Sequence, residues 1–205
     1  PLYILTSSNS ASAAEGFSYS MQSLNRATIV GEVTAGAAHG RSTEIVNNDY
    51  ILTLPSTRPV DPRTNDNWER KGVKPNIETS SDNAFYVAYA EVLNSLIKSN
   101  SKNLGLHQWV YPLVKAKSSQ YQPSQSDFNR IVGTFGKRKI FQKSGKLFYQ
   151  YSNDPAFEIE LLDKKTIVFK AFTEARLQAI YKNKQVIALK MLSLGEDERV
   201  FQRTM

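Results

Sequence analysis

The chain has 205 residues, of which 40% are apolar and 11% aromatic, which is enough to build a buried core and excludes a largely disordered protein. It contains no cysteine, which excludes disulfides, a thiol nucleophile and thiolate metal sites. Its two histidines, His39 and His107, are too few for a multi-histidine metal centre, and we expect no cofactor. No apolar run reaches the length of a membrane span, so we expect no integral membrane segment in this chain.

The net charge of +7 is unevenly distributed along the chain. Residues 1–100 carry slightly more acidic than basic side chains, whereas residues 101–205 hold the excess of lysine and arginine. A basic half of a protein can bind nucleic acid or an anionic surface. Here the lysines alternate with apolar residues along strand-like segments, which is typical of the solvated face of a sheet. This pattern favours a chain with no nucleic acid partner.

The first elements in chain order are a strand and a helix joined by small polar residues. Residues 2–5 are an apolar run typical of a buried strand, and residues 12–24 have a helical pattern with Phe17, Met21 and Leu24 on one face. Ser12 therefore lies at a helix N-terminus, where free N–H groups can stabilise a developing oxyanion. The same serine forms a capping-box pattern with Glu15, so it can equally be a simple helix cap.

Strands and helices continue to alternate up to residue 98. Residues 27–30 predict a short strand, residues 34–40 a loop of small residues, and residues 50–54 a strand that ends at Pro55. Residues 55–76 form a proline- and asparagine-rich excursion. A long helix follows, capped by Ser81-Asp82, with its apolar face made by Phe85, Ala88, Tyr89, Val92, Leu93, Leu96 and Ile97. This alternation predicts an α/β fold for residues 1–98.

The second half of the chain has a different pattern. Residues 99–127 are polar, contain Pro112 and Pro123, and are interpreted as a linker, part of which packs on a neighbour. Residues 128–205 predict a small antiparallel all-β domain, an open barrel or sheet of about six strands joined by tight turns. The expected strands are 139–142, 146–151, 157–162, 166–172, 176–182 and 185–192.

Three blocks of residues 1–98 resemble the C-terminal-processing (tail-specific) peptidase family. They are the nucleophile turn at 6–17, the strand and glycine loop at 26–36, and the W-E-x-x-G-V-x-P-type segment at 67–77. The blocks look closest to the branch that contains interphotoreceptor retinoid-binding protein modules and the tricorn protease core. The resemblance implies the C-terminal part of a ClpP/crotonase-like α/β peptidase core. Segment 132–136 also looks, more loosely, like a sheet domain appended to bacterial members.

By this resemblance the catalytic nucleophile maps to Ser12, and the backbone N–H of Ala13 is one oxyanion donor. Ser10 is one period too early for the helix cap and is interpreted as turn structure. In the tail-specific branch a lysine of the glycine loop deprotonates the serine. That position is Ala37 here, and residues 27–70 contain no lysine, so a serine–lysine mechanism is not expected.

The tricorn-like arrangement instead implies a histidine base, with a glutamate near the third block that matches Glu69. Glu69 would orient the catalytic network; the alternative is a solvated loop acid. The resemblance places the base upstream of Pro1, in a missing N-terminal segment. His39 is a possible substitute base, although a structural role in the glycine turn is the plainer interpretation. Asn76 replaces the aspartate that is usual in the third block.

These observations lead to two main hypotheses. The first is a serine-type endopeptidase that hydrolyses polypeptides through an acyl-enzyme on Ser12, with this chain as an inactive fragment of it. The second is a non-catalytic binding protein for a hydrophobic ligand or peptide on the same scaffold. A separate possibility is that the β domain binds a peptide, a glycan or the enzyme's own cleft. The resemblance implies a bacterial protein that is periplasmic or secreted.

Overall fold

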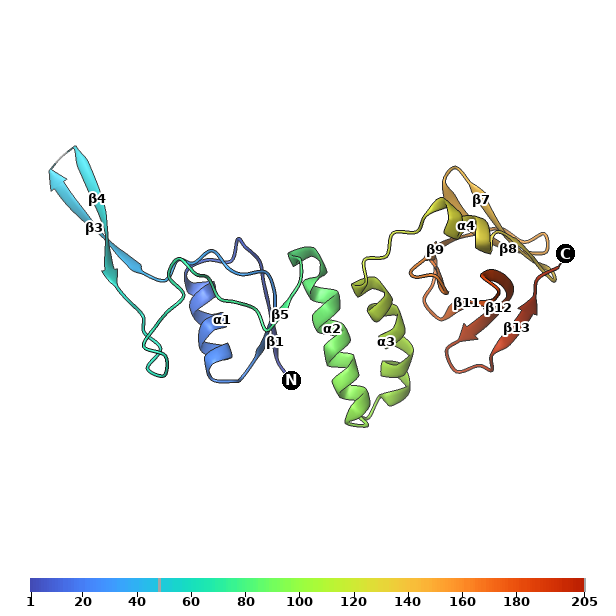
Figure 1. The fold of residues 1–205 in the computed structure, drawn as a ribbon, viewed down its shortest axis with the longest axis horizontal. Helices are drawn as coiled ribbons and strands as arrows, with labels where there is room; N and C mark the ends of the chain where they lie inside the picture. The colour runs from blue at the N-terminus through green and yellow to red at the C-terminus, as the bar shows by residue number, and fades with distance from the viewer. Residues whose placement is uncertain (48, 205) are drawn as a thin grey trace. The chain divides into compact units, whose positions relative to one another are not determined.

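The computed structural model describes residues 1–47 and 49–204. The chain divides into two compact units, Pro1–Leu104 and Gly105–Met205, and each is described by itself. Figure 1 shows an α/β unit followed by a unit made mostly of antiparallel strands, as the sequence predicts. Among the described residues no helix has the length and apolar character needed to cross a membrane.

The first unit is built on a three-stranded parallel sheet with the order β1-β2-β5. Its strands are β1 (Tyr3–Thr6), β2 (Thr28–Gly31) and β5 (Ile77–Glu78), and α1 (Ala13–Ser23) connects the first two. Helix α2 (Ser81–Lys98) places Ala84 and Ala88 against Val30 of the central strand. Because the strands are parallel, the turn from β1 into α1 lies at the carboxyl edge of the sheet, where α/β folds bind ligands.

Two details of these helices differ from the prediction. The expected apolar face of α1 is not its buried face, because Phe17 and Leu24 are 57% and 74% exposed while Glu15 and Ser18 are buried. Helix α1 packs through small and polar side chains, which a search for apolar periodicity does not detect. The N-cap of α2 is Ser80 rather than Ser81, and Phe85 of the expected apolar face is exposed.

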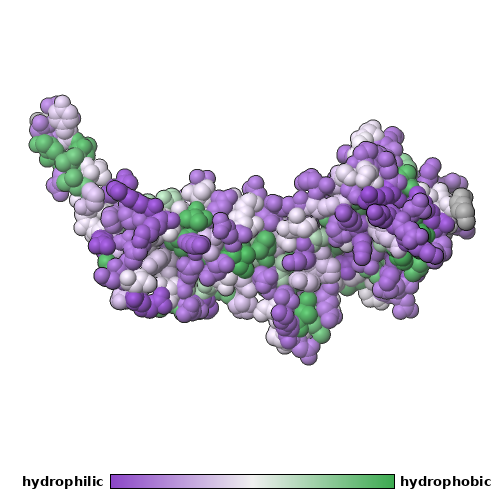
Figure 2. Space-filling view, viewed as in Figure 1, coloured by the Kyte–Doolittle hydropathy of each residue, from purple (hydrophilic) through white to green (hydrophobic). Residues whose placement is uncertain are grey.

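A two-stranded hairpin extends from this unit. Strands β3 (Gly40–Asn47) and β4 (Tyr50–Thr57) pair only with each other, and Figure 2 shows apolar atoms on the surface of this hairpin. The expected stop at Pro55 is wrong, because β4 continues to Thr57 and Pro55 lies opposite Arg41. Proline is tolerated there because a two-stranded ribbon has free edges that need no N–H donor. Its exposed apolar residues are Ile45, Val46, Tyr50, Ile51, Leu52 and Leu54.

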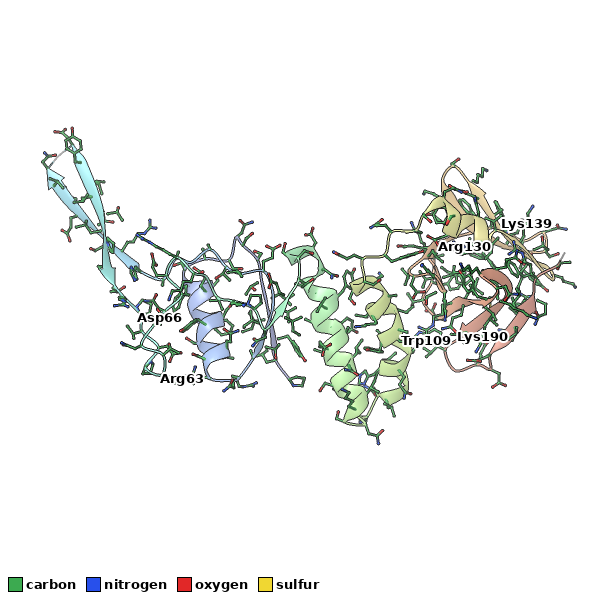
Figure 3. All side chains as sticks on the ribbon, viewed as in Figure 1. Arg63, Asp66, Trp109, Arg130, Lys139 and Lys190 are labelled. Carbon is green, nitrogen blue, oxygen red and sulfur yellow. The ribbon has the colours of Figure 1, made fainter. Side chains whose placement is uncertain are left out.

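The expected linker is largely helical. Helix α3 (Leu104–Ser118) runs through Pro112, and helix α4 (Gln125–Ile131) begins at the capping residue Ser124. Proline removes one N–H donor from the helix and disturbs the carbonyls of the preceding turn. The carbonyl that loses its donor is that of Gln108. The next carbonyl, that of Trp109, accepts a hydrogen bond from Arg176 at 2.8 Å, and the guanidinium also stacks on the indole ring. Trp109 is labelled on α3 in Figure 3.

The second unit is an eight-stranded antiparallel sheet with its strands in sequence order. Its core draws apolar residues from seven successive strands and from Ile131 of α4. The two short edge strands, with three and four residues, were not predicted. After the last strand, the N–H of Thr204 donates to the carbonyl of Thr134 at 2.8 Å, so the two ends of the sheet meet. The strands are β6 (Gly133–Phe135), β7 (Arg138–Lys143), β8 (Lys146–Tyr151), β9 (Phe157–Leu161), β10 (Thr166–Phe169), β11 (Ala175–Lys182), β12 (Gln185–Ser193) and β13 (Arg199–Gln202).

Candidate active site

The turn between β1 and α1 is closed by its own polar residues. The hydroxyl of Ser10 accepts a hydrogen bond from the Ser7 N–H at 3.1 Å, and the Ser10 N–H donates to the Ser7 carbonyl at 3.0 Å. The carbonyl of Ser10 in turn accepts from the N–H of Ala35 at 2.9 Å. Ser10 therefore has the turn-forming position that the sequence assigned to it, while Ser12 lies at the helix entrance.

Ser12 has an unusual backbone conformation for a residue with a side chain. Its φ is 55° and its ψ is −121°, outside the regions that L-residues normally occupy. Such a conformation costs about 1–3 kcal/mol and persists only where the surrounding structure enforces it. The same sharp, strained strand-to-helix turn presents the nucleophilic serine in α/β-hydrolases. Ser12 is exposed, and it forms with Glu15 the capping box that the sequence predicts, in which the contact from the Glu15 N–H to the Ser12 hydroxyl is looser than a standard hydrogen bond.

The first N–H groups of α1 lie next to this serine. Ala13 is the first helical residue, is exposed, and in the described chain its N–H has no hydrogen-bond acceptor. The positive end of the helix dipole is at the same place. A free, solvent-facing donor beside a hydroxyl is what an oxyanion donor requires, so the geometry is compatible with the role expected for Ala13.

Glu15 is the residue that organises this site, and the sequence analysis treated it only as part of a capping box. Its side chain is 0% exposed, and both of its carboxylate oxygens accept two hydrogen bonds. Oε1 accepts from the Thr34 hydroxyl at 2.5 Å and from the Gly36 N–H at 2.6 Å. Oε2 accepts from the N–H groups of Ser12 and Ala37, both at 2.8 Å. One carboxylate thus holds the serine turn and the glycine loop together.

The charge of Glu15 is maintained inside the protein. Burial alone would raise the pKa of this carboxyl, but the hydrogen bonds from Thr34, Ala37, Gly36 and Ser12 outweigh it, and the pKa is lowered. The Thr34 hydroxyl also accepts from the Val73 N–H at 2.7 Å, which extends the network to the third sequence block. The side chain is therefore an anion at neutral pH.

The backbone of the glycine loop, within residues 26–36, contacts the backbone of the third sequence block, residues 67–77, directly. The carbonyl of Gly36, which has φ of 83°, accepts from the N–H of Arg70 at 2.8 Å. Gly72 has φ of 72°, and a Cβ atom there would lie 2.2 Å from the carbonyl oxygen of Thr34. Only glycine permits both the backbone conformation and the contact. The blocks at 26–36 and 67–77 are therefore parts of one site.

Glu69 binds the glycine loop from the other side. Its Oε2 accepts from the N–H of Ala38 at 2.7 Å and from that of His39 at 3.1 Å, and these bonds lower the pKa of Glu69. The carboxylate contacts backbone, and in the described residues it makes no hydrogen bond to a catalytic side chain. Glu69 is half-buried, and the choice between an orienting role and a solvated loop acid stays a prediction.

The other predicted residues are placed as follows. The His39 ring has Nε2 buried without a hydrogen-bond partner in the described chain, and no hydrogen bond there joins it to Ser12. Ala37, at the position of the family lysine, donates its N–H to Glu15. Asn76 accepts from the Ile29 N–H at 2.8 Å and so fixes β2. Within residues 1–47 and 49–204 no cluster of three or more potential metal ligands occurs.

A cavity of about 460 Å³ lies beside α1. Gly16, which lines it, is one helical turn after Ser12 on the same side of the helix. The buried ring of Trp68 forms part of its wall and packs on Tyr19, with ring centroids 5.1 Å apart. Arg63, which lies beside the C-terminal half of α1 in Figure 3, pairs with Asp61 at 3.2 Å, and this contact lowers the pKa of Asp61 to about 2.

This geometry can be compared with known protein families. The residues that form the strained turn, the glycine loop and the Trp68 segment all lie in one continuous stretch of sequence that ends before α2. Residues 1–79 match the model of peptidase family S41, whose members are peptidases. This match does not extend to the eight-stranded sheet. Residues 1–79 of this chain are therefore similar to peptidase family S41.

Proposed function

We propose that this protein is a serine-type endopeptidase in which Ser12 is the nucleophile. The observation that carries the proposal is the strained, exposed backbone of Ser12 at the carboxyl edge of a parallel sheet, directly before a free helical N–H. The Ser12 hydroxyl attacks a peptide carbonyl, the acyl group is transferred to its oxygen, and the leaving amine takes up a proton. The Ala13 N–H donates to the oxyanion that forms. Water then hydrolyses the ester.

In this proposal Glu15 and Glu69 are positioning residues. Glu15 fixes the Ser12 N–H and the glycine loop, and Glu69 fixes the following residues of that loop through Ala38 and His39. Neither carboxylate has a path to the Ser12 hydroxyl through the hydrogen bonds described here. The proton of Ser12 is therefore taken by a separate base, and His39 is the one candidate imidazole in the first unit.

The test is a comparison of two serine variants in the full-length protein. Ser12→Ala should abolish hydrolysis of an unstructured polypeptide and labelling by a fluorophosphonate probe. Ser10→Ala, a matched loss of one hydroxyl in the same turn, should retain both, because the backbone hydrogen bonds of Ser10 to Ser7 and Ala35 still close the turn. Hydrolysis that persists in Ser12→Ala would refute the proposal. His39→Gln tests the substitute base, since loss of hydrolysis with unchanged stability would assign it that role.

The second candidate is a binding protein for a hydrophobic ligand. The observation that favours it is the cavity beside α1, whose lining includes Trp68, Tyr19, Leu24 and Val60. A cavity of this size is within the range of small-molecule sites. The test is binding of a fluorescent fatty acid. Binding by the unmodified protein that is lost in Gly16→Phe, together with no fluorophosphonate labelling of Ser12, would favour this alternative.

A further inference from the structure

The topology of the second unit gathers three hairpin turns at one end of the sheet. Each strand from β6 to β13 is antiparallel to its neighbour, so alternate turns lie at the same end. The turns β7–β8, β9–β10 and β11–β12 share one end, which we call the basic end. Helix α4 leads into β6 at this end, and its Gln125 is bonded to Gln142 of β7 at 2.8 Å.

Lysines are concentrated at one end of the sheet. Every turn of the basic end carries a pair of lysines, Lys143 and Lys146, Lys164 and Lys165, and Lys182 and Lys184. The turns at the opposite end and the strand residues beside them carry both signs, with the acids Asp154, Glu174, Glu196, Asp197 and Glu198 and the bases Lys137, Arg138, Lys170 and Arg199. The sequence analysis interpreted these lysines as the solvated face of a sheet, which would spread them along the strands. In the structure they are instead gathered in the turns at one end of the sheet.

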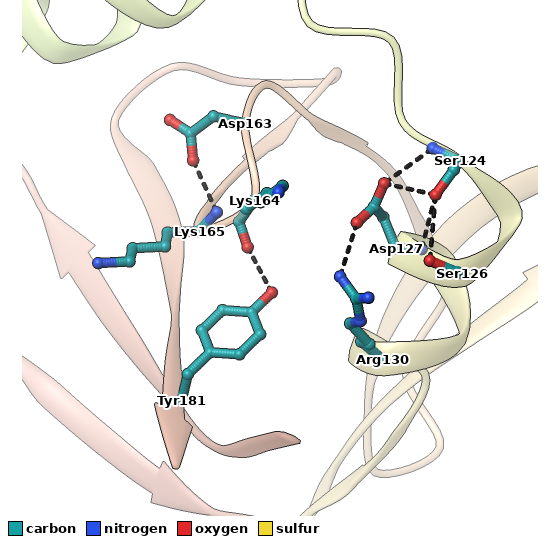
Figure 4. Close-up of polar contacts among 8 residues, drawn as sticks. All are labelled: Ser124, Ser126, Asp127, Arg130, Asp163, Lys164, Lys165 and Tyr181. Carbon is teal, nitrogen blue, oxygen red and sulfur yellow. Dashed lines mark hydrogen bonds and ion pairs between the residues drawn. The ribbon is translucent and has the colours of Figure 1, made fainter. Parts of the chain in front are cut away.

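A cavity of about 370 Å³ is present at the basic end. Its lining is Arg130, Lys164, Lys165, Tyr181 and Lys184. Figure 4 shows Tyr181 and Lys164 on one side and Arg130 of α4 on the other. The Tyr181 hydroxyl donates to the Lys164 carbonyl, which fixes the β9–β10 turn. A second cavity of about 750 Å³ also includes Arg130 in its wall, together with Arg203.

The positive charge of this cavity is not neutralised by the protein. In the described part of the chain Lys164, Lys165 and Lys184 form no ion pair and are exposed. Asp127 pairs with Arg130 at 3.1 Å and is also bonded to the hydroxyl and N–H of Ser124. The carboxylate of Asp163 accepts from the N–H groups of Lys165 and Thr166 and so stabilises the turn. The cavity thus has an excess of cationic groups.

We propose that the cavity at the basic end binds a phosphate-bearing small molecule or headgroup. The excess of positive charge over Asp127 suits an anion of charge two or more, and lysine ammonium groups bind phosphate as point charges. The cavity volume suits a small ligand or a lipid headgroup better than a polymer. The Arg130 guanidinium, held in place by Asp127, supplies directional donors to phosphate oxygens. This site is independent of the peptidase chemistry proposed for the first unit.

The experiment is calorimetric titration of the 205-residue chain with pyrophosphate. The variant Lys164→Gln/Lys165→Gln/Lys184→Gln removes three charges from the cavity, and the matched control Lys102→Gln/Lys115→Gln/Lys137→Gln removes three exposed lysines elsewhere. We expect pyrophosphate to bind about tenfold more weakly to the first variant, since each exposed ion pair contributes a factor of roughly two to five. The control should bind as the unmodified chain does. Far-UV circular dichroism checks that both variants fold.

Three further probes decide the chemistry and source of the ligand. Citrate that binds as tightly as pyrophosphate would overturn the choice of phosphate over carboxylate. A second probe is a set of phosphatidylcholine vesicles that contain phosphatidylglycerol. If the protein sediments with them and Lys164→Gln/Lys165→Gln/Lys184→Gln does not, the ligand is a lipid headgroup. Pyrophosphate binding without sedimentation supports a soluble phosphate. Oligothymidylate that binds more tightly than either would overturn the proposal in favour of nucleic acid. Equal loss of binding in both lysine variants, or no pyrophosphate binding by the unmodified chain, would also overturn it.

Discussion

Replacing Glu15 by glutamine tests whether one buried carboxylate holds the candidate active site together. Each oxygen of Glu15 accepts two hydrogen bonds, and three of the four donors are backbone N–H groups. Glutamine keeps one acceptor oxygen and replaces the other by an NH₂ group that can only donate. The Thr34 hydroxyl can rotate to accept from it, but the Gly36 N–H on the same side cannot. At least one buried N–H therefore loses its partner.

The magnitude follows from these contacts. A buried donor without an acceptor costs about 1–3 kcal/mol. The two bonds that survive change from charged to neutral, and this lowers the contribution of each by about 1 kcal/mol. Together the terms predict that Glu15→Gln destabilises the first unit by about 3–5 kcal/mol. This value is a large fraction of the stability of a domain of this size, which is typically about 5–15 kcal/mol.

The assay is urea unfolding followed by the fluorescence of Trp68. A Trp109→Phe background removes the tryptophan of the second unit, so that the signal reports only on the first. The matched control is Glu44→Gln on the exposed strand β3, which should change the stability by less than about 0.5 kcal/mol. A loss below about 1 kcal/mol in Glu15→Gln would show that the four hydrogen bonds do not act as described.

Three other outcomes are expected. Ser12→Gly should make the first unit more stable than Ser12→Ala by about 1–2 kcal/mol in urea unfolding, because only glycine relieves the backbone strain; equal stabilities would contradict that strain. Hydrogen bonds from Ser124 lower the pKa of Asp127 to about 2, below the value of about 3.9 in the unfolded chain. The ionised carboxylate therefore stabilises the second unit fully above pH of about 3.9, and this stabilisation is lost as the pH falls towards 2. Asp127→Asn should flatten the stability profile of thermal unfolding in that pH window. Hydrogen exchange should be faster in the β3–β4 hairpin than in β11–β12, because a two-stranded ribbon is only marginally stable by itself; equal protection would argue against an isolated hairpin.

The sequence was sufficient to find the strand-to-helix turn that carries Ser12. The apolar run before Thr6, the small polar residues and the helical pattern after Ser12 locate a strand-to-helix junction, and both elements are present within a few residues of their expected bounds. The resemblance to a peptidase family that was drawn over residues 1–98 is confirmed for residues 1–79. The strain at Ser12 was not predicted, because the surrounding contacts include hydrogen bonds from Glu15 to loop residues 21 and 22 positions further along the chain, which a local pattern does not show. The roles of Ser12, Ala13, Glu69 and His39 stay predictions.

The errors have a common physical cause. Pro55 was interpreted as the end of a strand, and Pro112 as part of a linker, because both were judged by local rules. A free ribbon edge tolerates Pro55, and helix α3 runs through Pro112 with the carbonyl of Trp109 bonded to Arg176. The surrounding structure in each case overrides the local rule. The prediction of an apolar buried face for α1 was wrong for a similar reason. The helix is held by the buried polar contacts of Glu15 rather than by apolar packing.

The strained conformation of Ser12 links the reaction proposed for this residue to the stability of the first unit. Glycine relieves the backbone strain at position 12, so a serine there costs stability that glycine would not. Under the proposed mechanism, a change from serine to glycine would raise stability and end hydrolysis in one step, without repacking any side chain. The residue at this position in related sequences would then indicate which of them keep the proposed nucleophile.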